Sequence, residues 1–240
     1  HVLYIDAHAA WKGNSAESLS ALEKEYLARL PIARNDFDKA HIYGLGYIYA
    51  RSAITNDARA SSVLPGIASI TGTRLPDLLA GLKRAVDQIE WALFIDDTFV
   101  DAYILNGWIF QYVDLLRRED AATAGGKNER VFARFFPKYL WERSIPLYEK
   151  ALTTNDETAN PEAEGNLHLN IANCYFLLNN YPKALTHYAL TNRFKNRFNS
   201  PVEEALFRFH YAYCLWQNGD IANAREEMNS TLSIYRRLAS

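Results

Sequence analysis

The sequence predicts an all-α protein, an α-α superhelix in which helix pairs stack along the chain. Three observations support this fold class. A shift of forty positions superimposes matching residues in the last third of the chain: Ala172 on Ala212, Cys174 on Cys214, and Ala184 on Ala224. The matches are small residues at helical spacing, and turn residues divide each copy into two helices. Such repeats bury their apolar faces against neighbouring repeats, which favours a solenoid.

Composition excludes several other classes. The chain has 240 residues, of which 49% are hydrophobic and 22% charged, enough to bury a substantial core. Its formal net charge is −2, so it has no positive field to attract nucleic acid. Because no run approaches the roughly eighteen apolar residues that span a bilayer, we expect no membrane span. The first residues lack the pattern of a signal peptide, and the sequence indicates no compartment.

The first part of the chain predicts less regular repeats. A partial repeat is expected over 1–32, followed by two expanded repeats over 39–97 and 100–155. In each expanded repeat an insertion separates two helices, predicted at 41–50 and 82–93 in the first and at 101–112 and 141–152 in the second.

Two features of the second expanded repeat are unusual. The run from Arg130 to Trp141 alternates basic and aromatic residues and would be amphipathic on a helix. It predicts either a helix that extends the preceding repeat with its basic edge in water, or a lid over the groove or a contact with an anionic partner or a membrane surface. Pro146 would be costly inside a helix, so it predicts the first turn of a helix that starts near Arg143.

The last two repeats are regular, over 165–198 and 205–238. Pro182 is typical of the first turn of a helix and predicts where the second helix of one repeat begins. In the next repeat, Gly219 is expected to take a left-handed conformation at the end of the first helix, and Asp220 to cap the second.

These repeats resemble the tetratricopeptide family. That family places a small residue near the middle of each helix, where the helices meet closely, and this chain offers matching pairs: Gly46 with Ala85, Gly107 with Ser144, Ala172 with Ala184, and Ala212 with Ala224. The resemblance covers most of the chain and implies one domain over 1–240.

The resemblance also implies a concave groove lined by the first helix of each repeat. The candidate binding residues at the matching positions are mostly aromatic: Tyr43, Tyr47, Ile104, Trp108, Tyr112, Asn173, Phe176, Phe209, Tyr213 and Trp216. The carboxylate clamp known in this family needs lysine, arginine and asparagine there, and only Asn173 fits. An aromatic groove suits an apolar or amphipathic guest.

We therefore expect a non-catalytic binding or scaffold module that captures a peptide or protein partner. One alternative is an apolar small molecule, as in the solute-binding tetratricopeptide lipoproteins of bacterial tripartite transporters. Another is an enzyme that uses the groove, which the lack of a clustered acid, base and nucleophile disfavours. Exposed terminal repeats would also allow self-association.

The sequence predicts no cofactor and no metal site. His168 and His187 fall on different helices, and no histidine grouping has the density of a metal site. Cys174 and Cys214 occupy equivalent positions one repeat apart, about 10 Å, too far for a disulfide. We expect two buried thiols, inert because an apolar setting raises the thiol pKa.

Overall fold

The computed structural model describes residues 36–55, 75–154, 161–193, 198 and 200–239, together with Lys24. Within these residues every regular element is a helix, and helices adjacent in the chain pack in pairs, which confirms the predicted all-α repeat arrangement. The partial repeat predicted over 1–32 lies outside the described residues apart from Lys24, as does the insertion at 56–74.

The chain divides into two compact units, 1–143 and 144–240, here called the N-terminal and C-terminal units. The division falls inside the repeat predicted over 100–155: its first helix belongs to the N-terminal unit and most of its second helix to the C-terminal unit. A single domain over 1–240 stays a prediction.

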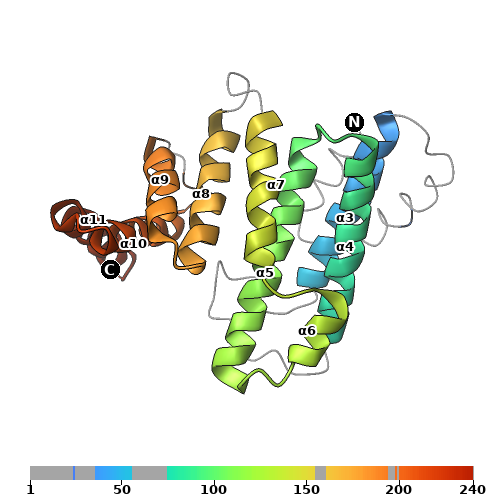
Figure 1. The fold of residues 1–240 in the computed structure, drawn as a ribbon, viewed down its shortest axis with the longest axis horizontal. Coiled ribbons are helices and arrows are strands. Elements are labelled where there is room, and N and C mark those ends of the chain that lie inside the picture. Colours follow the sequence, from blue (N-terminus) through green and yellow to red (C-terminus); the bar gives the residue numbers. More distant parts are fainter. Residues whose placement is uncertain are drawn as a thin grey trace. The chain divides into compact units, whose positions relative to one another are not determined.

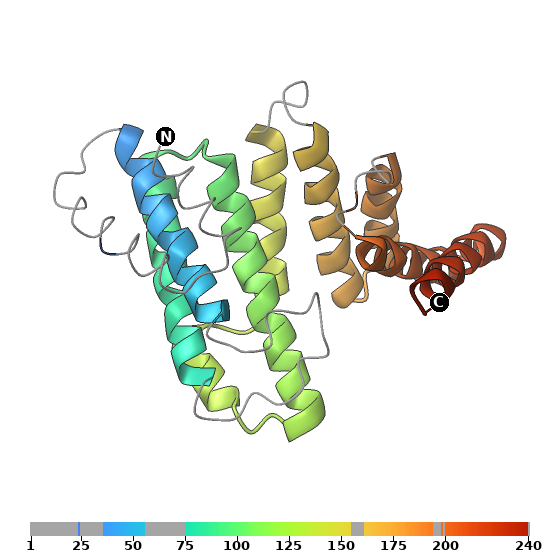
Figure 2. The ribbon, with the colours of Figure 1, turned by 180° about the vertical axis from the view of Figure 1, so that it is seen from behind.

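The N-terminal unit is built on α4, which contacts its other helices. The described helices of this unit are α3 (Asp36–Thr55), α4 (Leu75–Ile95), α5 (Val100–Ala124) and α6 (Glu129–Phe135). Figure 1 shows α3 and α4 side by side along their length. Seen from behind, α6 lies beside one end of α4 (Figure 2).

Small residues let α3 and α4 approach each other closely. A Cβ atom built on Gly46 would lie 3.1 Å from the carbonyl oxygen of Ala85, which confirms the predicted contact of this pair. A Cβ built on Gly81 would lie only 2.7 Å from the Cβ of Ala53. Glycine is therefore required at position 81 by a close approach of two helices.

The run from Arg130 to Trp141 is not one helix, so the prediction that it forms a single helix extending the preceding repeat is wrong. Helix α6 ends at Phe135, the chain turns through Tyr139 at φ 62°, and α7 (Leu140–Thr154) then begins. Phe132 and Phe136 are both buried, so these rings belong to the core instead of an amphipathic surface.

An arginine on α5 explains why the run breaks. The guanidinium of Arg117 donates to the backbone oxygens of Phe136 and Pro137, at 3.1 and 2.8 Å, and pairs with Asp114 at 3.1 Å. It also lies 5.2 Å from the centre of the Phe132 ring. Because these carbonyls accept from Arg117, the link between α6 and α7 is extended, and no helical hydrogen bond is needed there.

The prediction that Pro146 marks a first turn is also wrong. Pro146 lies inside α7, which begins at Leu140. The helix starts earlier because the backbone N–H of Trp141 donates to Asp114 Oδ2 at 3.1 Å, so a carboxylate on α5 caps the first turn. Burial raises the pKa of Asp114 more than these hydrogen bonds and Arg117 lower it.

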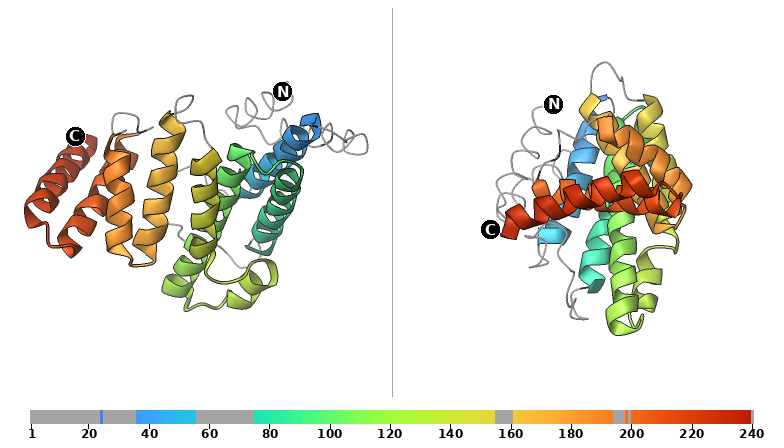
Figure 3. Two further views of the ribbon diagram at one scale, coloured as in Figure 1. Left: turned by 45° about the horizontal axis from the view of Figure 1, so that its top comes forward. Right: turned by 90° about the vertical axis from the view of Figure 1, so that its left-hand side faces the viewer.

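The C-terminal unit holds two helix pairs after the end of α7. These helices are α8 (Pro161–Leu177), α9 (Tyr181–Thr191), α10 (Pro201–Gln217) and α11 (Ile221–Ala239). Figure 3 shows α8 paired with α9 and α10 paired with α11, and α10 also contacts α9. The two predicted regular repeats correspond to these pairs, although each begins about four residues earlier, at a proline.

The predicted turns are confirmed. Gly219 has φ 85° between α10 and α11, and Asn179 takes the same left-handed conformation, φ 59°, between α8 and α9. Pro182 lies in the first turn of α9. The carboxylate of Asp220 accepts from the backbone N–H of Asn223 at 3.2 Å, so it caps α11.

Candidate functional site

Aromatic rings from three helices meet in the C-terminal unit. Phe176 on α8 lies 5.6 Å from Tyr213 on α10, and Tyr213 lies 5.6 Å from Trp216, measured between ring centroids. Tyr181 at the start of α9 contacts both Phe176 and Tyr213, at 5.9 and 5.3 Å. With Phe209 one turn before Tyr213, these residues form what we call the aromatic face: Phe176, Tyr181, Phe209, Tyr213 and Trp216.

The aromatic face is open to solvent. Trp216 is 54% exposed and Phe209 is 39% exposed, whereas Phe176, Tyr181 and Tyr213 are half-buried. Four of the five residues were predicted binding residues, and the structure brings three of them, Phe176, Tyr213 and Trp216, into one row of ring contacts. The edge-to-face geometry of the two contacts in this row fixes the orientation of the exposed Trp216 ring.

A histidine packs against the aromatic face. The His210 ring stacks on Phe176 with centroids 4.3 Å apart, and burial lowers the pKa of His210 to about 4. Among the described residues its Nδ1 atom has no hydrogen-bond partner. His210 is therefore neutral at pH 7 and adds an uncharged ring to the site.

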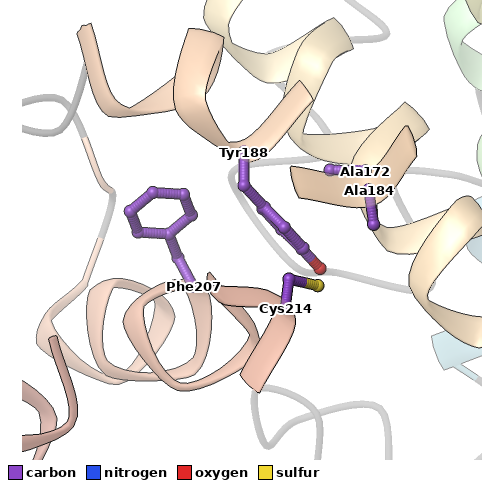
Figure 4. Packing of buried hydrophobic residues seen from close by; sticks show 5 residues of the cluster. All are labelled: Ala172, Ala184, Tyr188, Phe207 and Cys214. Carbon is purple, nitrogen blue, oxygen red and sulfur yellow. The ribbon is translucent and has the colours of Figure 1, made fainter. Parts of the chain in front are cut away.

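Asn173, one of the predicted binding residues, makes a structural contact between α8 and α9. Its Oδ1 accepts from the hydroxyl of Tyr188 at 2.7 Å. Tyr188 is fully buried, and Figure 4 shows its ring between Phe207 on one side and Ala184 on the other. Asn173 thus joins α8 to α9, and this contact anchors the helices that carry the aromatic face.

Two histidines predicted on different helices lie side by side in the structure. The Nδ1 atoms of His168 on α8 and His187 on α9 lie 3.1 Å apart, a hydrogen-bond distance. Burial and the neighbouring His168 lower the pKa of His187 to about 4. Spacing within one helix does not reveal this pair, because the two histidines lie on different helices and meet only when α9 packs against α8.

The other predicted binding residues lie in the N-terminal unit. On α5 the rings of Trp108 and Tyr112 stack with centroids 5.4 Å apart, and Ile104 lies one turn before them, all three half-buried. On α3, Tyr47 is half-buried. Tyr43 lies in the core: it is only 4% exposed, and its ring centroid lies 4.8 Å from that of Phe99. The prediction that Tyr43 lines a binding surface is therefore wrong.

The predicted state of the cysteines is confirmed. Cys174 and Cys214 are buried and no disulfide joins them. Burial raises the pKa of Cys214 to about 12, so it stays a thiol at neutral pH. Over the described part of the chain, no group of three or more histidine, cysteine or acidic residues could hold a metal ion. None of the described helices is long and apolar enough to cross a membrane.

Acid is expected to destabilise the C-terminal unit between pH 6.5 and 4. The pKa values of His187 and His210 are about 4 in the folded protein, and both rise to about 6.5 on unfolding. In this window the unfolded chain binds more protons than the folded chain, so the free energy of unfolding falls as pH falls. The contribution of the two histidines to this loss levels off once the pH is below about 4. For His210 we expect a loss on the order of 2 kcal/mol, measured by urea unfolding at each pH.

The variant His210→Phe serves as the control, because phenylalanine can keep the stack on Phe176 and cannot be protonated. Its stability should fall less than that of the wild type over the same pH range. Parallel pH profiles for the two proteins would contradict the assignment of this dependence to His210.

Comparison with known proteins adds no identification. No protein-family model matches this chain, and no match was found among curated proteins.

Proposed function

We propose that this chain is a non-catalytic helical-repeat module, of tetratricopeptide type, that binds a peptide or protein segment through its aromatic face. The observation that carries the proposal is the open row of ring contacts from Phe176 through Tyr213 to Trp216. All five residues of the face are uncharged aromatics, and the histidine beneath it is neutral at pH 7. Rings held in place by their neighbours offer apolar area at little entropic cost on binding.

The exposure of the face favours a peptide over an enclosed apolar solute. Trp216 and Phe209 are each more than one third exposed, and small-molecule sites usually bury most of their ligand. A peptide helix or extended segment can instead lie across an open surface and insert one or two apolar side chains between rings. The hydroxyls of Tyr181 and Tyr213 would add hydrogen bonds at its edges.

The proposal assigns the chain no catalytic step. The groups nearest the face that could transfer protons or attack a substrate are poorly suited to either role: His210 is half-buried with a pKa of about 4, and the pKa of Cys214 is about 12. We therefore interpret the site as one that recognises a ligand by shape and apolar contact.

Selection from a random peptide library displayed on phage, followed by calorimetric titration of the enriched peptides, tests the proposal. Trp216→Ala should weaken binding at least tenfold, because exposed aromatic anchors dominate such interfaces. Phe94→Ala is the matched control: Phe94 is 89% exposed on α4, outside the face, and its loss should leave the affinity unchanged. Circular dichroism would check that both variants fold.

Two results would overturn the proposal. The first is a set of selected peptides that bind Trp216→Ala as tightly as the wild type. The second is a small molecule that stays bound to the purified protein in native mass spectrometry and is lost on denaturation or in Trp216→Ala. That result would instead support the solute-binding alternative.

A further inference from the structure

Helix α11 carries an apolar stripe next to the side that it buries against its partner α10. Ile221, Leu232 and Tyr235 are 49%, 44% and 44% exposed, and Met228 is half-buried. At about 100° per residue these four residues fall within an arc of about 60° on α11. We call them the end stripe. The residues that α11 buries, Ala224, Thr231 and Ile234, lie on the adjoining side.

The preceding repeat shows what such a side contacts. Forty positions earlier, Tyr181 and Tyr188 on α9 correspond to Ile221 and Met228 on α11. Helix α10 covers them: Tyr188 contacts Phe207 and Tyr211, with centroids 5.8 and 6.4 Å apart, and Tyr181 contacts Tyr213 at 5.3 Å. One repeat earlier, therefore, the corresponding side is covered by a helix with aromatic residues at i and i+4.

Charge indicates the chemistry of a helix that would cover the end stripe. Arg225 and Arg236 are both exposed, and helical geometry places them along the same edge of the end stripe. In a second copy packed antiparallel, α11 against α11, identical edges meet, so Arg225 would lie against Arg236. That arrangement brings like charges together, whereas acidic side chains would complement this edge.

We propose that the end stripe is a docking site for an amphipathic helix of another protein. This helix has aromatic residues at i and i+4 and acidic residues on the flank that meets Arg225 and Arg236. It takes the place on α11 that α10 takes on α9. The site lies on α11 and shares no residue with the aromatic face, and the proposal does not depend on the function proposed for that face.

The test uses two synthetic helical peptides that differ only in flanking charge. Both carry phenylalanine and tyrosine at the spacing of Phe207 and Tyr211; one has glutamate on the flank and the other lysine. Calorimetric titration should show that the glutamate peptide binds the protein at least tenfold more tightly than the lysine peptide. The difference should shrink as salt is added.

Three variants locate the site and test its charge. Leu232→Glu places a charge in the end stripe and should abolish binding of the glutamate peptide. The double variant Arg225→Glu, Arg236→Glu should reverse the preference, so that the lysine peptide binds more tightly. Phe94→Ala, in the N-terminal unit, should change neither affinity. All four positions are exposed, so these variants should fold.

Several outcomes would overturn the proposal. Equal affinities for the two peptides, absence of binding, or an unchanged preference in the double variant would each contradict it. Sedimentation that shows a dimer of the wild type but a monomer of Leu232→Glu would assign the end stripe to a second copy instead.

Discussion

Replacement of Tyr188 by alanine is expected to lower the free energy of unfolding of the C-terminal unit by about 3–5 kcal/mol. Tyr188 is fully buried, and its ring contacts Phe207 and Tyr211 on the next helix. Because Tyr188 belongs to one helix pair and its ring contacts belong to the next, the cavity would lie at the junction of two repeats. Urea unfolding followed by circular dichroism measures the change, and amide hydrogen exchange would assign it to 161–239.

The variant Tyr188→Phe separates the two contributions of this side chain. It keeps the ring in place and removes only the hydroxyl that donates to Asn173. We expect a loss of about 1 kcal/mol, the usual cost of one such hydrogen bond. If Tyr188→Ala were no more destabilising than Tyr188→Phe, the ring would not hold the two repeats together as described.

The fold could be predicted where local signals and packing agree. The left-handed turn at Gly219 and the cap at Asp220 depend only on a few neighbouring residues, so both were predictable from composition at the turn. The contact between Gly46 and Ala85 was predictable because only small residues allow two helices to approach so closely.

Predictions failed where a distant side chain determines the backbone. The amphipathic pattern from Arg130 to Trp141 satisfies a helical period. However, the carbonyls of Phe136 and Pro137 accept hydrogen bonds from Arg117 and not from backbone N–H groups of a helix. Asp114 likewise moves the start of the next helix ahead of Pro146. Both residues contact backbone groups 19 to 27 residues later in the chain, beyond the end of α5 and the whole of α6, and local sequence signals do not reveal such contacts.

The site shows the same division. The resemblance to the tetratricopeptide family implied Phe176, Tyr213 and Trp216 as binding residues, because repeating helices present equivalent positions to the same side. They did not predict Tyr181, which contributes from the following helix, or His210, whose altered pKa arises from burial against Phe176. The available signal for Tyr181 was its position directly before Pro182. Proline is typical of the first turn of a helix, so Tyr181 was expected to begin the helix that follows α8.

In the N-terminal unit, Gly81→Ala is expected to lower the free energy of unfolding by about 1–3 kcal/mol. Alanine normally stabilises a helix interior relative to glycine by about 1 kcal/mol, so the expected sign is the reverse of the usual one. The reason is the 2.7 Å separation between the new Cβ and that of Ala53, which forces α3 and α4 apart. Thermal and urea unfolding measure the effect.

A double-mutant cycle with Ala53→Gly tests this cause directly. Ala53→Gly alone should cost about 1 kcal/mol through helix propensity. In the double variant, the methyl group is transferred from α3 to α4, and the gap between the helices is filled once again. The double variant should therefore be more stable than the sum of the single effects predicts, by about 1 kcal/mol or more. Additive effects would mean that the helices separate freely at this point, and that Gly81 is not required by their close approach.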